Sequence, residues 1–553
     1  MICGDCHIYG HTHRPALQYY STCPSSNKGC CGCNTVTKLE RDIEETAKKL
    51  TQLLVDLQRA KTEMNYCHST IIKKLPTEII STIFENFVAN SIDLDSRDNA
   101  LQADVLPIPL KLSQVCRSWK RIASSTGKIW TTMVISLGLC LDPERVELLQ
   151  HWMARTKGLP LDISIYIGKS LPENILLRFH TMDPSSENRV LEVLLGTSKQ
   201  WRNVRLQLPY VIMQALCRRL DNNVNNFFAE LTDVRLYEDE SADMEGRPWT
   251  NFQISPKHVT LTGLGLPLNV IDILWGTVTT AHLKSFYESQ CMELFRSAPM
   301  LISVTLEDIW ENDDGGSGSS QDYSVIQHST IQHLSCHLYD GVIDIMQWLK
   351  LPNLTSLKFN ARDTPDTWYA ALQVLFAHSA CSLERLEMID HSFEHSLIIR
   401  LLNTVPSLQH LRLESGPWDD IEDWSPIHWS PIPFLRHLAE TSKGEAFLPS
   451  LKTLEYDVEN MNFPWQLVPD IFGSSEKNIH ALLDQRQLTS FKVINRYKTP
   501  TKKALKGKLI PRQILRQLLS LRQRGAEIIY EDEEGKDLFK MSGEPTGGAN
   551  HKT

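Results

Sequence analysis

Residues 36–71 carry an apolar residue at nearly every first and fourth position of a seven-residue repeat. With Val36 as position a, the a and d positions are Val36, Leu39, Ile43, Thr46, Leu50, Leu53, Leu57, Ala60, Met64, Cys67 and Ile71. The intervening positions are rich in charge, and no Gly or Pro interrupts them. This pattern predicts a heptad helix over 35–72, about 50 Å long, suited to a coiled coil. Its apolar seam has two candidate partners, a second copy of the chain that makes a homodimer through 36–71, or another part of the same chain.

A second helical pattern fills residues 74–136. It begins KLPTEIISTIFENFV, with Pro76 at the helix opening and Glu78 in the first turn, where the helix dipole favours negative charge. After a polar insert at 89–108, apolar residues recur at helical spacing through 112–123 and predict a second helix. Two helices in so short a stretch bury little by themselves. Part of their apolar surface is therefore expected to contact a partner.

A third pattern recurs through the rest of the chain: an apolar residue, two others, an apolar residue, one other, and an apolar residue. Phrases of this form begin at Trp201, Leu301, Ile331, Leu354, Leu383, Leu408, Leu451 and Leu488. From Leu301 onward the steps between phrases are 30, 23, 29, 25, 43 and 37 residues. The second and third apolar positions lie on one face of a strand, as a stacked parallel sheet requires.

Each recurring phrase resembles the strand of an irregular leucine-rich repeat, whose units combine one strand with a return helix. An ordinary α/β domain with parallel strands is the alternative. Strands are also expected at 131–137 and 161–167 with a helix at 143–156 between them, and a last helix at 514–521 precedes a strand at 526–530. The acidic, Gly/Ser-rich segment Glu311–Gln321 (ENDDGGSGSSQ) is expected to be a flexible loop.

The outward-facing residues of these phrases are predicted to form a substrate-binding surface. In each phrase from Leu301 onward, the residue between the two inward positions is polar: Thr305, Ser335, Lys358, Glu387, Arg412, Glu455 and Lys492. On adjacent strands about 4.8 Å apart they would form a line of roughly 30 Å, long enough for an extended peptide. The alternative is the polar face that any sheet in water presents.

The segment at 74–136 resembles a known family. LPTEIISTIF, LSQVCRSWKRIASS and the Ile129-Trp130 pair fall in the order of the F-box, in particular the F-box-like domain common in fungal proteins. The long insert differs from the family pattern, as does Gly127-Lys128-Ile129 where a proline-containing turn is usual. The resemblance implies a helical domain that docks on the adaptor subunit of a cullin-RING ubiquitin ligase.

Carried over residue by residue, the resemblance implies an adaptor interface with Lys120 at its rim. Its residues are Leu75, Pro76, Ile79, Ile83, Phe84, Leu112, Val115, Cys116, Trp119 and Lys120. The chain is then expected to be the substrate receptor of an SCF-type ligase, which reaches a cullin through a SKP-type adaptor and holds an unidentified protein substrate on its repeats. The alternative is a non-catalytic repeat scaffold that joins no ligase.

Six of the 13 cysteines lie within the first 33 residues. Cys3, Cys6, Cys30 and Cys33 form two Cys-x2-Cys pairs, which can supply the four thiolates of a zinc site. The alternative is a cysteine-rich leader without a metal. The other seven cysteines are scattered, mostly among apolar neighbours, as is typical of reduced core thiols in the cytosol or nucleus.

Composition argues against several other functions. A net charge of −9 argues against a general nucleic-acid binder, and no apolar run approaches the roughly 20 residues of a membrane span. His391, Glu394 and His395 match the short inverted zincin pattern, but their position at the start of a return helix favours a solvated helix face. No cysteine follows Cys381 to carry ubiquitin. We expect no enzymatic activity, no catalytic residue and no cofactor.

These patterns together predict an α/β chain in which a long N-terminal helix and a helical F-box precede an irregular leucine-rich-repeat solenoid. The expected parts are a cysteine-rich leader (1–34), the heptad helix (35–72), the F-box-like domain with its insert (73–136), the repeat domain (137–530) and a polar tail (531–553).

Overall fold

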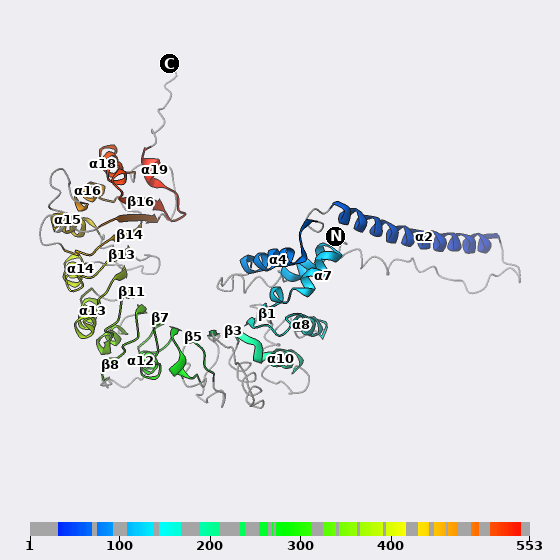
Figure 1. Ribbon diagram of the computed structural model, residues 1–553, viewed down its shortest axis with the longest axis horizontal. Coiled ribbons are helices and arrows are strands. Elements are labelled where there is room, and N and C mark those ends of the chain that lie inside the picture. The colour runs from blue at the N-terminus through cyan, green and yellow to red at the C-terminus, as the bar shows by residue number, and fades with distance from the viewer. Residues whose placement is uncertain are drawn as a thin grey trace, which may run out of the picture. The chain divides into compact units, whose positions relative to one another are not determined.

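The computed structural model divides into two compact units, one formed by Met1–Ser91 with Ile108–Thr126 and the other by Ile92–Pro107 with Gly127–Thr553 (Figure 1). The residues it describes are 31–68, 74–91, 108–136, 143–166, 188–208, 233–237, 254–263, 268, 273–311, 324–338, 342–361, 365–390, 394–415, 430–441, 447–459, 463–472, 488–496 and 509–543.

The first unit is helical in its described residues. Its helices are α2 (Cys31–His68), α4 (Thr77–Ser91), α6 (Ile108–Val115) and α7 (Arg117–Ser125). Helix α2 has 38 residues, so it extends about 57 Å at 1.5 Å per residue. The predicted heptad helix is thus present over the described part of its range.

Cys116 divides the second predicted helix into two. The prediction of one helix through 112–123 was wrong, because Cys116 has extended backbone angles (φ −161°, ψ 169°) that no α-helix can include. Its Sγ accepts a hydrogen bond from the Trp119 backbone N–H at 3.4 Å, which caps α7. The Val-Cys-Arg-x-Trp sequence therefore encodes a turn between α6 and α7.

The sheet unit begins inside the predicted F-box-like domain (73–136). The last elements of that predicted stretch, η1 (Gly127–Trp130) and β1 (Thr132–Ser136), are the first elements of the sheet unit. Trp130 is fully buried there, and its carbonyl accepts a 2.8 Å hydrogen bond from Nε1 of Trp152 on α8 (Pro143–Arg155). The Trp130 side chain thus packs in the core of the sheet unit.

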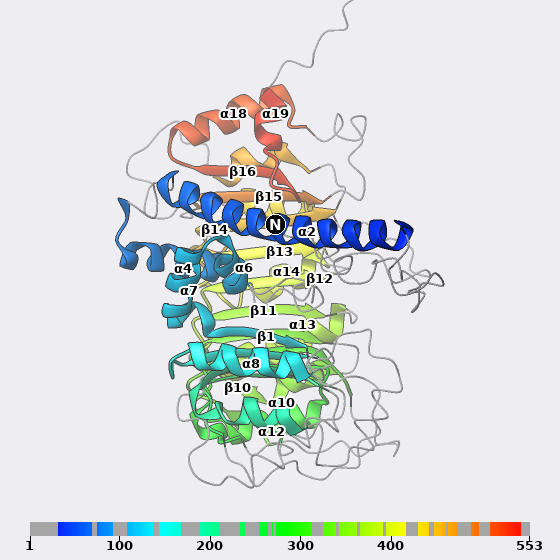
Figure 2. The same cartoon turned by 90° about the vertical axis from the view of Figure 1, so that its right-hand side faces the viewer.

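A 14-stranded sheet dominates the second unit, and all of its strand pairs are parallel. The strands follow β1 in chain order as β2 (Leu161–Tyr166), β3 (Trp201–Gln207), β4 (Asp233–Tyr237), β5 (His258–Thr262), β6 (Thr280–Lys284), β7 (Ser303–Ile309), β9 (His333–Leu338), β11 (Ser356–Ala361), β12 (Arg385–Asp390), β13 (His410–Ser415), β14 (Thr453–Glu459), β15 (Ser490–Arg496) and β16 (Glu527–Asp532). Figure 2 shows β11 to β16 running side by side. A short separate pair joins β8 (Ile326–Gln327) to β10 (Leu349–Lys350).

Helices between the strands line one face of this sheet (Figure 1). They are α8, α10 (Asn188–Leu195), α12 (Glu288–Ser297), α13 (Pro365–Ser379), α14 (His395–Leu402), α15 (Ile432–Glu440), α16 (Val468–Ile471) and α18 (Arg512–Gln523), with 3-10 turns η3 (Ser198–Gln200), η5 (Trp275–Thr277), η6 (Val342–Trp348) and η8 (Trp465–Leu467). Gly525, at φ +99°, ends α18, and the Ala526 N–H then bonds back to the Leu521 carbonyl at 3.1 Å.

The recurring phrases form the core between sheet and helices. In every phrase from Leu301 onward, the second and third apolar residues are at most 2% exposed. Strands β4 to β6 were not predicted, although Leu231, Pro256 and Val278 begin phrases of the same form. Pro256 and Ala281 make the phrases of β5 and β6 less regular, whereas the phrase of β4 has three ordinary apolar residues and was within reach of the same rule. The structure confirms a mixed α/β architecture with a large parallel sheet.

The start of the predicted polar tail is folded. Residues 533–537 turn the chain after β16, and α19 (Leu538–Gly543) follows. Leu538 and Phe539 are buried, and the Arg522 guanidinium lies 4.3 Å from the Phe539 ring centroid. The tail prediction was wrong up to residue 543 because these two apolar side chains hold the segment against α18 and β16.

Several predictions fall on residues outside the described ranges. These are Cys3, Cys6 and Cys30 of the leader, residues 92–107 of the insert, residues 312–321 of the acidic segment, and the tail beyond 543. Cys33 lies in the first turn of α2. No group of potential metal ligands occurs among the described residues, and no helix there is long and apolar enough to cross a membrane.

Candidate protein-interaction surfaces

Helix α4 presents two apolar faces, one buried and one exposed. Ile80, Phe84 and Val88 are at most 4% exposed, and they pack against the other helices of the unit. Ile79, Ile83 and Phe87 precede them by one residue each and are 47 to 52% exposed. Because successive residues of a helix differ by about 100° in direction, the second set forms its own stripe. We call Ile79, Ile83 and Phe87 the α4 stripe.

The ten predicted adaptor residues divide between surface and core. Pro76, Ile79, Ile83, Val115 and Lys120 are exposed, Leu75, Cys116 and Trp119 are intermediate, and Phe84 and Leu112 are buried. Phe84 and Trp119 pack together, with ring centroids 4.9 Å apart. Phe84 and Leu112 thus hold the helices together. Phe87 extends the exposed stripe and was missed, although it lies one helical turn after Ile83.

The seven predicted substrate-face residues lie in one continuous row. Direct register pairs join Thr305 to Ser335, Ser335 to Lys358, Lys358 to Glu387, and so on through Arg412 and Glu455 to Lys492. They alternate with the buried phrase positions, so they face away from the helices. The sheet extends the row beyond both ends, to His282 on β6 and to Ile529 on β16.

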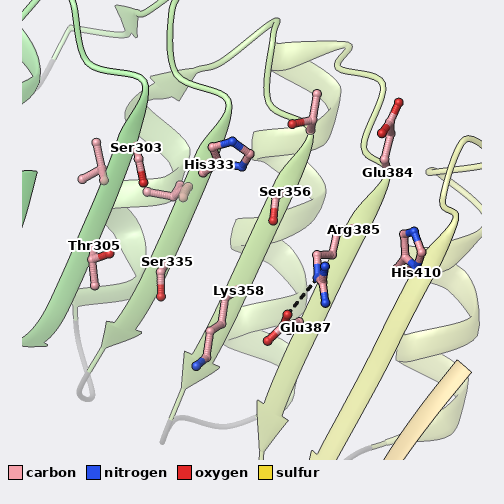
Figure 3. A pocket seen from close by; sticks show the side chains of 13 residues that line it. Ser303, Thr305, His333, Ser335, Ser356, Lys358, Glu384, Arg385, Glu387 and His410 are labelled. Carbon is pink, nitrogen blue, oxygen red and sulfur yellow. Dashed lines mark hydrogen bonds and ion pairs between the residues drawn. The ribbon is translucent and has the colours of Figure 1, made fainter. Parts of the chain in front are cut away.

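An open hollow of about 540 Å³ lies on this strand face (Figure 3). Four residues of the row line it: Thr305, Ser335, Lys358 and Glu387. A parallel row two residues earlier contributes Ser303, His333, Ser356, Arg385 and His410. The strands there carry serine and threonine between longer side chains, and these short hydroxyls form the floor.

Lys358 is the free cation of the hollow. Arg385 Nε bonds to Glu387 Oε1 at 2.9 Å, which neutralises both groups. Lys358 is exposed and makes no hydrogen bond or ion pair with any described residue. Burial, together with the positive charges of Arg385 and Lys452, lowers the pKa of His410. At neutral pH its imidazole is therefore an uncharged hydrogen-bonding group.

Beyond the hollow toward β15, the face carries a network of ion pairs among its own residues. Asp457, with a side chain only 7% exposed, lies 3.2 Å from Arg412 Nη2 and 2.7 Å from Arg496 Nε. Glu414 bridges the same arginines at 3.0 and 3.4 Å. Lys492 is paired with Glu531 on the last strand. Charges that satisfy one another in this way are poor attachment points for a ligand.

A second network lies on β6, β7 and β9, at the other side of the hollow. Glu307 Oε1 is 3.4 Å from His282 Nε2, and its Oε2 is 3.4 Å from Lys284 Nζ. The contact with His282, followed by the charge of Lys284, lowers the pKa of Glu307 to about 2. Lys284 also contacts Asp308 at 3.1 Å. The hollow thus lies between two networks whose charged groups are already paired with one another.

The His391-x2-Glu394-His395 motif is only partly described. Glu394 precedes α14 and accepts a short hydrogen bond from Ser396 Oγ, and His395 is the first residue of that helix. Burial lowers the pKa of His395. His391 lies outside the described residues.

Comparison with known proteins bears on the first unit. A family model described as F-box-like matches residues 72–136. No curated protein matches the chain. The matched stretch contains α4, α6 and α7, and it extends through η1 and β1 of the sheet unit. Residues 72–136 of this chain are therefore an F-box-like domain.

Proposed function

We propose that this chain is the substrate-recognition subunit of an SCF-type ubiquitin ligase. The observation that carries the proposal is the exposed α4 stripe inside an F-box-like domain, since domains of this family generally bind SKP-type adaptors. The adaptor then links the chain to a cullin. The chain supplies binding surfaces, and its partners supply the ubiquitin-transfer chemistry.

The α4 stripe is suited to a stable protein contact. Each of its three side chains is about half exposed, so covering them contributes on the order of 2 to 4 kcal/mol of binding free energy. The buried face of the same helix keeps the fold intact while the exposed face is free. Val115, which is 59% exposed at the end of α6, is the fourth apolar contact that we propose. Lys120 contributes a charged rim residue.

Capture of a purified SKP-type adaptor by the full-length chain tests this proposal. Ile83→Asp should lower the affinity by at least about tenfold, because it places a carboxylate in an apolar contact. Thr82→Asp is the matched control on the neighbouring, exposed position, and it should bind as the unmodified chain does. A folded chain that captures no adaptor would remove the ligase proposal and favour a repeat scaffold outside any ligase.

We propose that the protein substrate binds the strand face of the sheet unit, and that this unit is an irregular leucine-rich-repeat solenoid. The support is the continuous row from Thr305 to Lys492 and the hollow beneath part of it. Lys358→Glu should change the set of proteins that co-purify with the chain. Arg516→Glu, an exposed change on α18, should leave that set unaltered. The opposite result would place the substrate on the helical side.

The cytosol or nucleus is the proposed location. Cys291 and Cys336 are buried free thiols, and burial raises the pKa of both. Protonated, enclosed thiols of this kind are compatible with a reducing compartment. Fractionation of cells that express a tagged chain tests this assignment.

A further inference from the structure

Helix α2 exposes the apolar seam of its heptad pattern over the part of the seam that the structure describes. The apolar side chains at its a positions and the leucines at its d positions are 50 to 68% exposed from Val36 to Met64. A helix in a protein gains most of its stability by covering such a face. The seam is therefore an association surface that no described part of the chain covers.

We propose that α2 binds α2 of a second copy as a parallel, in-register, two-stranded coiled coil. Val36 and Ile43 at a positions, with Leu39 at the first d position, favour two parallel strands. In this arrangement each g residue faces the e residue five positions later on the other copy. Asp56 then faces Lys61, an attractive pair.

The alternative orientation is the antiparallel pairing about the helix centre, with Leu50 opposite Leu53 of the other copy. It would place Asp42 against Glu63, two carboxylates that repel, but also Lys49 against Asp56 and Glu40 against Lys61, which attract. The a and d residues, and not the charges, therefore favour the parallel orientation. In the parallel arrangement Asp42 faces Ala47 and Lys49 faces Leu54. None of these parallel pairs brings like charges together.

The pairing of the two helices is independent of the proposed ligase function. One consequence of the parallel arrangement, however, rests on that proposed function. Five residues, 69–73, connect α2 to residues that lead into α4, and they span less than about 20 Å. Both F-box-like domains would therefore start at the same end of the coil. Two adaptors and two substrate faces in one particle would raise the effective affinity for a substrate that carries two binding segments.

The mass of the protein in solution tests whether the apolar seam of α2 joins two copies of the chain. At micromolar concentration, sedimentation equilibrium of the full-length chain should give twice the mass of one chain. Leu50→Asp at an a position should give one chain mass. Val55→Asp is the matched control, since Val55 is an aliphatic residue of similar exposure on the same helix but lies at an outer f position. A monomeric unmodified chain, or equal effects of the two changes, would overturn the proposal.

Cys67 tests the orientation. It is a free, exposed thiol at a d position, so a parallel in-register pair places the two copies of Cys67 face to face. Mild oxidation with diamide should produce a Cys67–Cys67 disulfide, identified by mass spectrometry of the linked peptides, and Cys67→Ser should abolish that species. A dimer in which this linked peptide never forms would contradict the parallel register.

A charge exchange tests the Asp56–Lys61 contact. Asp56→Lys should raise the dimer dissociation constant several-fold by placing two lysines together, and adding Lys61→Asp should restore it to within about twofold. Circular dichroism is the control for helicity, because Asp56 also contacts Gln52 and Arg59 of its own helix. No rescue in the double variant would overturn this register.

Adaptor capture by the monomeric Leu50→Asp variant should be unimpaired. This result separates failure of the dimer proposal from failure of the proposed function.

Discussion

The helices of the first unit and the strands of the second carry equally regular apolar patterns. The patterned residues of the strands are buried, whereas many of those on the helices are exposed. In the sheet unit, the second and third residues of each phrase from Leu301 onward are at most 2% exposed. On α2 and the outer stripe of α4, apolar side chains at regular spacing are about half exposed or more. The period of a pattern thus identifies the apolar side of an element, but it does not say which chain covers that side. An apolar pattern that its own fold leaves open is a candidate contact for another protein.

The sharpest form of this comparison uses two phenylalanines. Phe491 on β15 is fully buried, with the rings of Tyr456, Phe463 and Trp465 around it, whereas Phe87 on α4 is 52% exposed. Phe491→Ala should lower the free energy of unfolding of the sheet unit by about 3 to 5 kcal/mol. Phe87→Ala should leave unfolding by urea within about 0.5 kcal/mol of the unmodified chain and should weaken adaptor binding. Similar losses of unfolding free energy in the two variants would contradict the assignment of Phe491 to the core and Phe87 to the surface.

A second test applies the same comparison to charged groups. Asp457→Ala removes the more buried of the two carboxylates that Arg412 and Arg496 share, and should destabilise the sheet unit by about 2 kcal/mol. Glu387→Ala removes a pair with Arg385, whose side chain is 53% exposed, and should cost less than about 0.5 kcal/mol. The urea concentrations at the unfolding midpoints of the two variants measure this difference in stability. A larger effect at Glu387 would mean that the network near β15 is not the more structural of the two.

A smaller effect is expected from pH. The pKa of Glu307 is lowered from 4.5 to about 2, so its contribution to stability is fully present above pH 4.5 and is lost as the pH falls through 2. Because the side chain is about a third exposed, we expect Glu307→Gln to cost only about 1 kcal/mol at pH 7. The difference in unfolding free energy between this variant and the unmodified chain should shrink between pH 4.5 and 2. A constant difference between pH 4.5 and 2 would contradict the lowered pKa of Glu307.

Much of the sheet could be predicted because strand residues alternate between core and surface with a period of two. That rule alone placed Thr305, Lys358 and Lys492 in one outward row. It could not show which of these charges are already paired, because Lys492 meets Glu531 only through the register of the last two strands. The sequence therefore suggested both Lys358 and Lys492 as ligand contacts, whereas the pairing of Lys492 with Glu531 favours Lys358.

The errors in the helical part have a common physical cause. Helical spacing continues through Cys116, but a side chain that caps the next helix interrupts the backbone there. Phe84 and Ile83 are adjacent in an apolar sequence, and only the packing of α6 and α7 decides that Phe84 is buried and Ile83 is not. Pattern alone gives no means of separating core from interface on a helix with two apolar faces.

Hydrogen exchange of the full-length chain with and without saturating SKP-type adaptor tests the central claim most directly. The α4 stripe and the end of α6 should gain protection on binding, because adaptor contact covers and stabilises those helices. The backbone of the strands from β7 to β15 should exchange equally in both samples. Protection confined to the sheet unit, or no change anywhere in α4 at saturation, would contradict the claim that the exposed apolar surface of the F-box-like domain is the adaptor contact.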